Sequence, residues 1–417
     1  MRIGYACLAI AQEGAQLKTC TLKNASAGRL LSLAGENFAA LENMIDYNIS
    51  NNISLYRISS DIVPFGSSRA AELLWDHEHA SRLSSIAEKI KASNMRVSMH
   101  PGQYSVLNSP DAGVVRRAIE DLAYHTRFLD ALKLDATHKI VLHIGGKYGD
   151  AASALSRFAD VYRDLPAAVI KRLILENDGS IFTIAEVLEL CHCIGAPAVY
   201  DNLHNAINPA DATKSDAYWI NLCCDTWREK DGAQKTHYSQ QHPQKTRGAH
   251  SDTIAINPFL DYCHSLPGEN PDIMLEVKDK NRSAVKCVLC TSAPNQRLLE
   301  TEWGRYKYSV LERSPNDYQS IRALLKDKQG DNALVFYQTV EHALSLPEDK
   351  GRALNALEHV WGYFSESASP AQTRKYQSLR DGYLRGTTPL GLAKRLLYRL
   401  SLNDRQDYLL GSYYFTL

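Results

Sequence analysis

The sequence predicts an α/β protein: a (β/α)8 TIM-like barrel followed by an all-α C-terminal domain. Two patterns predict this fold class. Over roughly the first 280 residues, short runs rich in β-branched residues alternate with amphipathic segments, as in βα units around a parallel sheet. From about Arg297 onward, Leu, Ala, Tyr and Arg recur at helical spacing without a convincing strand. The length of 417 residues also exceeds the size at which one hydrophobic core usually stops growing, so two domains are expected.

The number of expected strands is the main argument for a closed barrel. Eight strands are expected, at residues 2–8, 54–59, 95–100, 139–144, 172–177, 198–202, 234–238 and 273–278. Helical periodicity is clearest at residues 70–91, 114–133, 151–164 and 184–193, which are long enough for right-handed crossovers. Eight such units close most economically into a barrel of about 250 residues or more.

The domain boundary is expected near residues 291–296, with the barrel at 1–290 and the helical domain at 297–417. Turn signals divide the tail into several helices, and they lie at Ser314-Pro315-Asn316, Lys328-Gln329-Gly330, Ser369-Pro370 and Thr388-Pro389.

Composition excludes some classes of protein. No apolar run approaches the about 20 residues that a membrane span needs. The chain begins Met1-Arg2-Ile3-Gly4-Tyr5 and moves into a strand without the regions of a signal peptide, so we expect a cytoplasmic protein. Its nine cysteines, including Cys287 and Cys290 in a lone CxxC, are then expected to be reduced core residues.

Net charge does not by itself predict a nucleic-acid-binding protein. The chain has 47 basic and 47 acidic residues; the tail after Gln296 holds 17 and 14 of them, which leaves 30 and 33 for the body. If the net acidic body acts on DNA, metal ions must neutralise several of its carboxylates.

Residues able to ligate a transition metal recur at the carboxyl ends of the expected strands. In a TIM barrel these ends meet at one face, where active sites are built. Any single histidine of this kind is more often structural, but the whole set favours a site for more than one ion. The mixture of imidazoles and carboxylates suits manganese, zinc or iron better than calcium or magnesium. The set comprises His100, His143, Glu176, Asp201, His204, His237 and Glu276, with His250 as a further candidate in a loop.

Other side chains are expected near this face. Strand periodicity places Lys235 on the same face as His237, and Lys278 on the same face as Glu276. A lysine there could neutralise charge, bind phosphate or, when uncharged, be carboxylated to a bridging ligand. Gln103 and Tyr104 follow His100 and form an amide and aromatic pair that could enter a duplex; an ordinary polar loop is the alternative.

The expected metal site leaves two reactions open, hydrolysis of phosphoesters and isomerisation of sugars. The chain resembles the UV-damage endonuclease family over residues 1 to about 280. The resemblance rests on many motifs in order: GYAC (4–7), YRISSD (56–61), MHPGQY (99–104), LHIGGK (142–147), LEND (175–178), YDNLH (200–204), KTHYS (235–239), GAHSD (248–252) and MLEVK (274–278).

The resemblance implies a barrel related to that of endonuclease IV, with up to three manganese-type ions (zinc or iron as alternatives) that act on damaged double-stranded DNA. It also implies ATP-independent nicking on the 5′ side of cyclobutane dimers, 6-4 photoproducts and some other lesions, including abasic sites. The eight candidate ligands above would hold the metals, and Lys235, which can be carboxylated, would act with Glu176 and Glu276 in catalysis. Gln103 and Tyr104, with Tyr5 beside them, would probe the duplex, and Arg57, Lys147 and Lys278 would also contact DNA.

The sequence departs from this family at two positions. Ser68 stands where a metal-binding histidine is expected, which puts the third metal site in question, and Ala9 stands in place of an asparagine. The tail resembles the YbgA-like domain of unknown function, through residues 306–308, 314–315, 351–364 and 383–390. We expect a monomer whose tail contacts DNA or another protein. A metal-dependent sugar isomerase or epimerase, and a lesion-binding protein with weak catalysis, are the alternatives.

Overall fold

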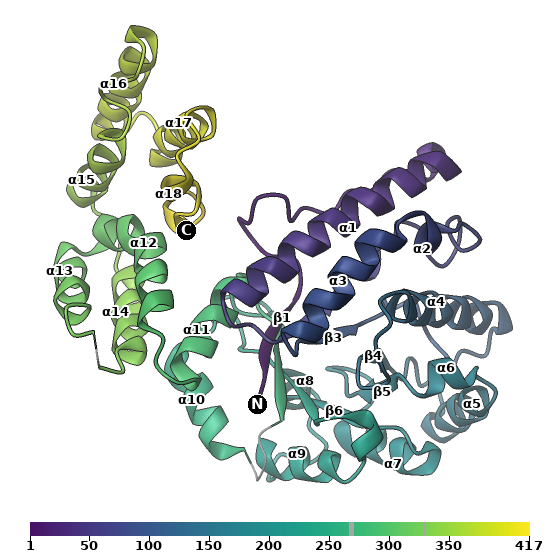
Figure 1. Ribbon diagram of the computed structural model, residues 1–417. Helices are drawn as coiled ribbons and strands as arrows, with labels where there is room; N and C mark the ends of the chain where they lie inside the picture. The colour runs from purple at the N-terminus through teal and green to yellow at the C-terminus, as the bar shows by residue number, and fades with distance from the viewer. Residues whose placement is uncertain (267–270, 329) are drawn as a thin grey trace. The chain divides into compact units, whose positions relative to one another are not determined.

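The computed structural model describes residues 1–266, 271–328 and 330–417 (Figure 1). These residues form two compact units, Met1–Val288 and Leu289–Leu417. Each unit is described separately.

The first unit is a closed barrel of eight parallel strands in sequential order, which confirms the predicted fold class. The strands are β1 (Ile3–Cys7), β2 (Leu55–Ile58), β3 (Arg96–Met99), β4 (Lys139–His143), β5 (Leu173–Glu176), β6 (Ala198–Asp201), β7 (Lys235–Tyr238) and β8 (Asp272–Leu275). Pairing of β1 with β8 closes the barrel. Gly4 permits the close approach of β1 to β2, because a Cβ there would meet the backbone carbonyl of Leu55 at 1.7 Å.

Helices surround the strands in Figure 1 and connect each strand to the next. They are α1 (Ala27–Ser50), α2 (Trp75–Glu78), α3 (Ala80–Ala92), α4 (Ala112–Ala131), α5 (Ala151–Arg163), α6 (Ala167–Ile170), α7 (Ile184–Ile194), α8 (Asn202–Ile207), α9 (Asp216–Cys224), α10 (Ile256–Ser265) and α11 (Asn281–Thr291). Side chains cap several of the helices that follow the strand ends, such as Asp111 at α4 and Thr183 in a capping box at α7. Each cap fixes where its helix begins, and the parallel order of the strands keeps their carboxyl ends at one face.

The helix expected at residues 70–91 is divided in two. The short helix α2 ends at Glu78 and α3 begins at Ala80, with His79 between them. The Nε2 atom of His79 lies 2.9 Å from the carbonyl oxygen of Leu31, and its ring packs edge-on against Phe38 of α1. This contact with α1 holds the break, and the helical periodicity of the segment gives no sign of it.

Ion pairs fill the amino end of the barrel. Arg96 donates to Asp272 at 3.0 Å and Lys139 to Asp231 at 2.6 Å, and all four side chains are buried. Buried charges are tolerated when they are paired and hydrogen-bonded, so these pairs form a polar layer opposite the expected active face.

Among its described residues, the second unit consists of helices joined by turns and loops and contains no strand, as predicted. Its helices are α12 (Gln296–Arg313), α13 (Pro315–Leu324), α14 (Ala333–Ser345), α15 (Lys350–Trp361), α16 (Pro370–Arg385), α17 (Leu390–Asn403) and α18 (Asp407–Leu410). Ser314 and Ser369 cap α13 and α16, and Pro389 precedes α17, as the turn signals indicate. The turn signal at 328–330 falls between α13 and α14, but Gln329 lies outside the described residues.

Among the described residues, no helix is both long enough and apolar enough to cross a membrane. Cys191, Cys223 and Cys287 are buried in the core, but Cys193 and Cys224 are exposed, so the expectation that all nine cysteines are core residues is wrong for these two.

Candidate metal centre

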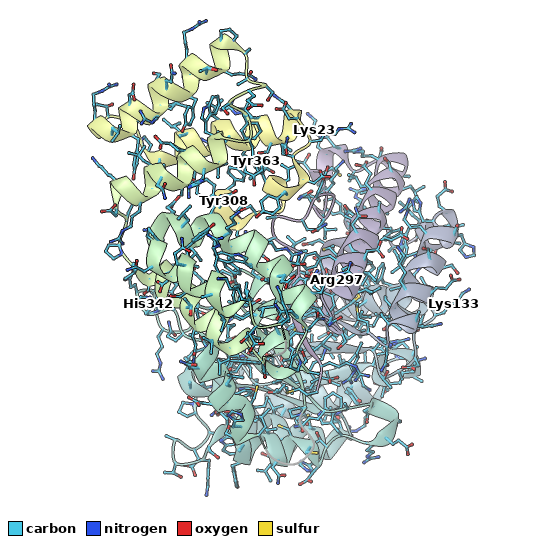
Figure 2. All side chains as sticks on the ribbon, turned by 60° about the vertical axis from the view of Figure 1, so that its left-hand side comes forward. Lys23, Lys133, Arg297, Tyr308, His342 and Tyr363 are labelled. Carbon is cyan, nitrogen blue, oxygen red and sulfur yellow. The ribbon has the colours of Figure 1, made fainter. Side chains whose placement is uncertain are left out.

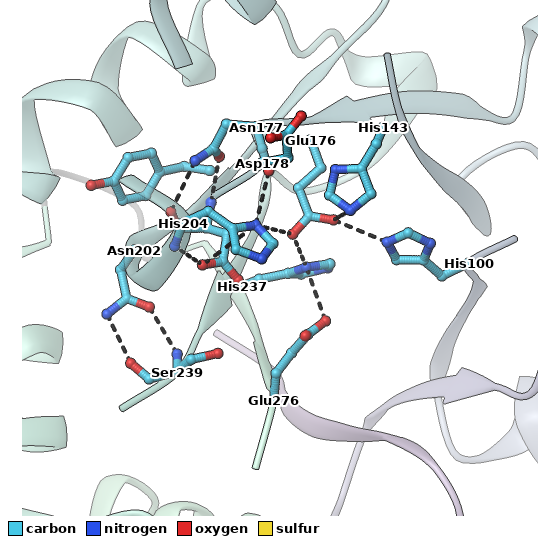
Figure 3. A network of polar contacts seen from close by, with 12 residues as sticks. His100, His143, Glu176, Asn177, Asp178, Asn202, His204, His237, Ser239 and Glu276 are labelled. Carbon is cyan, nitrogen blue, oxygen red and sulfur yellow. Dashed lines mark hydrogen bonds and ion pairs between the residues drawn. The ribbon is translucent and has the colours of Figure 1, made fainter. Parts of the chain in front are cut away.

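Glu176, at the carboxyl end of β5, lies at the centre of a group of imidazoles and carboxylates (Figure 3). Only 1% of this residue is exposed. Its Oε2 atom lies 3.1 Å from Nε2 of His100 and 3.6 Å from Nε2 of His143. Its Oε1 atom lies 2.8 Å from Nδ1 of His237 and 3.6 Å from Nδ1 of His204. Side chains from β4, β5, β7 and the segments that follow β3 and β6 therefore meet at one carboxylate.

Three sets of donors around Glu176 have the spacing of metal ligands. In each set, one donor atom per residue lies within 4.8 Å of the others. The sets are His100, His143 and Glu176; Glu176, Asp201 and His204; and Glu176, His237 and Glu276. A carboxylate common to three neighbouring sets is the kind of ligand that bridges ions in a multinuclear site.

Two of the imidazoles are held by the backbone in orientations that suit metal ligation. Nδ1 of His100 lies 3.0 Å from the carbonyl oxygen of Pro101, and Nδ1 of His204 lies 2.9 Å from that of Asn177. When each Nδ1–H donates to its carbonyl, Nε2 is left with a lone pair for a cation. Asn177 further supports the site, because its amide donates to the carbonyl of Asp201 and accepts from the Asp201 backbone N–H. Sequence reasoning did not single out Asn177, although it directly follows Glu176.

Several polar atoms at the site have no hydrogen-bond partner within the described part of the chain. They include Nε2 of His237, Nδ1 of His143 and Oδ2 of Asp201, all of them buried. Buried polar atoms are seldom left without a partner, so unpaired donor atoms of this kind fit a bound ion.

The electrostatics of the site also favour bound cations. Burial raises the pKa of Asp201 to about 6, and the neighbouring carboxylates of Glu176 and Glu276 add to the effect. Burial acts to lower the pKa of His204, but the carboxylates of Asp201 and Glu176 raise it to about 9. Three carboxylates thus compete for positive charge in a water-poor pocket, and divalent cations would supply that charge.

Arg57 supplies one positive charge within this pocket. Its guanidinium lies 2.5 Å from Oε1 of Glu276, and both side chains are 13% exposed. Burial acts to raise the pKa of Glu276, but Arg57 and His237 hold it well below its usual value. Arg57, expected to contact DNA, is therefore engaged with a candidate metal ligand.

Lys235 lies inside the barrel, paired in register with Asp272 at the amino end of β8. It is fully buried, and its Nζ atom has no hydrogen-bond partner among the described residues. Burial lowers its pKa well below the usual value, and the positive charge of Arg96 lowers it further. An uncharged amine in this position can react with carbon dioxide, as the carboxylation of a lysine requires.

His250 and Lys278 belong to none of the three donor sets. Nε2 of His250 lies 4.0 Å from Oε2 of Glu276. Strand β8 ends at Leu275, so strand periodicity does not orient Lys278, whose side chain is exposed.

Gln103 and Tyr104 are exposed on the loop that follows β3, and Tyr104 is 69% exposed. Tyr5 is not beside them, contrary to expectation. Its ring is fully buried, and its hydroxyl donates to Oδ1 of Asn48 at 2.9 Å. Residues alternate between the two sides of a strand, so Tyr5 points out of the barrel toward α1 and cannot reach DNA.

Two other residues lie in loops at the carboxyl ends of the strands. Lys147 forms an ion pair with Glu186 at 2.6 Å and keeps 38% of its side chain exposed. Ser68 is exposed in the loop after β2, where its hydroxyl donates to the carbonyl of Phe65.

Comparisons with known proteins agree with this architecture. The family model "UV-endonuclease UvdE" matches residues 1–298, and that of a protein family of unknown function, DUF1722, matches residues 307–417. A UV DNA damage endonuclease of Clostridium perfringens is 38% identical over 384 residues, covering 91% of this chain and 92% of its own. One of Bacillus pumilus is 33% identical over 246 residues, covering 58% and 76%.

A solved structure resembles the first unit. The crystal structure of SacUVDE is 34% identical, covers 69% of this chain and 96% of its own, and superimposes with a TM-score of 0.65. The family match over most of the chain, and the identity to relatives of nearly full length, lead to one conclusion: this chain belongs to the UV-endonuclease UvdE family.

Proposed function

We propose that the protein is a metal-dependent DNA repair endonuclease that nicks damaged double-stranded DNA on the 5′ side of UV photoproducts. Its substrates would be cyclobutane dimers and 6-4 photoproducts, and also abasic sites. The observation that carries this proposal is the buried Glu176, which three candidate ligand sets have in common at the mouth of the barrel. The names of the relatives support the choice of DNA over other phosphoesters.

The donors fit two or three divalent ions, with Mn²⁺ preferred and Zn²⁺ or Fe²⁺ as alternatives, because imidazoles and carboxylates occur in nearly equal number. We assign as ligands His100, His143, Glu176, Asp201, His204, His237, His250 and Glu276. Bound metal would supply hydroxide at neutral pH and stabilise the charge that develops on the scissile phosphate.

The protein residues would orient the ligands and position the DNA. Arg57 holds Glu276 in place through their ion pair and adds positive charge beside the scissile phosphate. Lys235, if carboxylated, would add an anionic group inside the barrel, on the amino-terminal side of Glu176 and Glu276. Lys147 and Lys278 would contact phosphates of the bound DNA, because both side chains are exposed to solvent.

Gln103 and Tyr104 would probe the duplex at the lesion. Both side chains project from the loop after His100, so a strand bound at the metal centre would pass beside them. A damaged base pair stacks weakly, which lowers the cost of inserting an aromatic ring and an amide.

The proposal is tested with a duplex that contains a single cyclobutane dimer, incubated with protein and Mn²⁺. We expect one nick on the 5′ side that leaves 3′-hydroxyl and 5′-phosphate ends, and no cleavage of the undamaged duplex. Binding to the lesion without a nick at high Mn²⁺ would indicate a lesion-binding protein instead. Conversion of a ketose by the metal-loaded protein, with intact DNA, would indicate a sugar isomerase.

A further inference from the structure

The second unit carries an aromatic and cationic surface that the barrel chemistry does not use. We call it the tyrosine patch, and it consists of Lys307, Tyr318, Arg322, Tyr363 and Tyr408. These residues come from α12, α13, the turn that follows α15, and α18, and they are linked by ring and cation contacts. Figure 2 shows Tyr363 beside Tyr308 of α12, where these helices meet.

Two rings of the tyrosine patch are presented to solvent in a defined arrangement. Tyr363 is 40% exposed and Tyr408 is 44% exposed. Their planes differ by 19° and their centroids lie 6.2 Å apart, so they offer nearly parallel faces. The hydroxyl of Tyr363 lies 2.9 Å from that of the buried Tyr308. Gly304 leaves room for the ring of Tyr408, since a Cβ there would lie 3.3 Å from it.

Two cations accompany these rings. Nζ of Lys307 lies 5.0 Å from the ring centroid of Tyr308 and 5.9 Å from that of Tyr408. The guanidinium of Arg322 lies 5.8 Å from the ring centroid of Tyr318. Aromatic faces attract cations, so these contacts hold the charges beside the rings.

Neither cation forms an ion pair with a described carboxylate, although nearby cations do. On the same helix as Lys307, Arg305 pairs with Glu302 at 2.6 Å. Burial lowers the pKa of Lys307, and the charge of Arg322 lowers it further. Within the described part of the chain, these two interacting like charges are therefore not offset by an ion pair with a carboxylate.

Cations without an ion pair among the described residues, next to two exposed and nearly parallel rings, match the chemistry of a single nucleic-acid strand. Phosphates carry the complementary charge, and bases stack on aromatic faces whatever their sequence. We propose that the tyrosine patch binds single-stranded DNA, with bases against Tyr363 and Tyr408 and phosphates on Lys307 and Arg322. This site lies in the second unit, so the proposal does not depend on the reaction assigned to the barrel.

Binding is tested with the full chain and a fluorescent oligothymidylate of about 15 nucleotides, followed by fluorescence anisotropy over a range of salt concentrations. The double variant Lys307→Gln, Arg322→Gln should weaken binding. It should also reduce the slope of log K against log salt by about 1.4, or about 0.7 for each phosphate of a single strand that the protein no longer neutralises. The control double variant Arg374→Gln, Lys375→Gln removes two exposed cations from α16 and should leave the slope unchanged.

Stacking is tested by removing one ring. Tyr408→Ala should lower the affinity at least about fivefold, whereas Tyr408→Phe should keep it, because the phenyl face still stacks. Tyr398→Ala is the matched control, since Tyr398 is also 40% exposed but lies on α17. Equal affinities for Tyr408→Ala, Tyr398→Ala and the wild type would overturn the proposal.

The position of the bound strand is tested by photocrosslinking with an oligonucleotide that contains 5-iododeoxyuridine, which reacts with stacked aromatic side chains. We expect crosslinked peptides that contain Tyr363 or Tyr408. Crosslinks confined to peptides of the barrel would overturn the proposal. Nicking of the single-lesion duplex is measured on the same variants, so a failure of the barrel's proposed reaction is recorded separately from a failure of the tyrosine patch.

Discussion

At the scale of single residues, Glu176 is a fully buried carboxylate surrounded by imidazoles. Burial alone would raise its pKa, but His237, His143 and His100 surround the carboxylate and hold its pKa well below the usual value. The side chain is therefore anionic in a place where anions are costly, and it contributes to every candidate ligand set. Such an energetic cost is typical of functional sites, where ionisable groups with shifted pKa values are concentrated.

Glu176→Gln should abolish nicking and lower the metal content. The amide keeps the size of the side chain but loses its charge. We expect the metal affinity to fall by more than the about 10- to 100-fold that is typical for a residue that only supports a ligand. Metal content is measured by elemental analysis after dialysis against Mn²⁺. Glu186→Gln is the control, because Glu186 lies on α7, pairs with Lys147 and belongs to none of the three donor sets, so this variant should retain the full metal content.

His138, at the amino end of the barrel, should make the protein less stable in acid. Burial lowers its pKa to about 4, and its Nδ1 accepts a hydrogen bond from the Val97 N–H. The unfolded chain binds this proton near pH 6.5 and the folded chain does not until about pH 4. The contribution of His138 to the free energy of unfolding is therefore fully present above pH 6.5. It is lost progressively as the pH falls toward 4, by about 1.4 kcal/mol per pH unit.

The measurement is urea unfolding at pH 7.5 and pH 5.0. His138→Gln should be less stable than the wild type at pH 7.5, but its loss of stability between the two pH values should be smaller by about 2 kcal/mol. The exposed His77 provides a control, and His77→Gln should show the pH dependence of the wild type. An unchanged pH dependence in His138→Gln would refute the assignment.

At the scale of elements, the loop after β3 joins the metal centre to the expected DNA probe. His100 begins the loop and points to Glu176, and Tyr104 projects from it into solvent four residues later. Gly102 lies between them. A Cβ at this glycine would be 2.4 Å from Cε1 of Tyr104, so the ring rests directly on the backbone of Gly102.

Gly102→Ala should displace the ring of Tyr104 without unfolding the protein, because the exposed side chain can rotate away. We expect weaker discrimination between lesion and undamaged duplex, with metal content and melting temperature close to those of the wild type. The measurement is the ratio of kcat/KM on the two duplexes. Gly149→Ala in the next loop is a comparison without a side-chain clash, although its positive φ adds some strain. A ratio no different from that of the wild type would show that the ring position is unimportant.

At the scale of the whole molecule, the chain forms two compact units, an α/β barrel and a helical unit. The three candidate ligand sets found among the described residues all lie in the barrel unit. The second unit has its own core around Leu357, Phe364 and Leu397, which are buried among tyrosines and leucines. Separate cores predict separate unfolding, since cooperative transitions usually belong to single domains.

Calorimetry of the full chain should therefore show two transitions. Mn²⁺ should raise the midpoint temperature of one transition and leave that of the other unchanged. At a free Mn²⁺ concentration 100 times Kd, the unit that binds the metal should gain about 2.7 kcal/mol of stability. Leu357→Ala removes a fully buried side chain of the second unit and should destabilise only the transition that does not respond to metal, by about 2–5 kcal/mol. If there is a single transition, and both Mn²⁺ and Leu357→Ala shift its midpoint, the two units unfold together.

The sequence by itself determined the eight strands, the order in which they close and the residues at their carboxyl ends. This was possible because strand periodicity and barrel topology are local or general rules, and His100, Glu176 and His237 needed only to lie at the ends of their strands to converge. The family resemblance then narrowed the chemistry, and the match to the family model supports it. The ligand and DNA-binding roles themselves stay predictions.

Only the tertiary structure decided which way individual side chains face and what they touch. Tyr5 lies within the GYAC motif, yet it packs toward α1, because its position on β1 turns the side chain away from the mouth of the barrel. The pairing of Arg57 with Glu276 joins residues 219 positions apart, and the tyrosine patch joins α12, α13, α18 and the turn after α15. Such contacts depend on register, packing and helix placement over long sequence distances, and no local pattern encodes them.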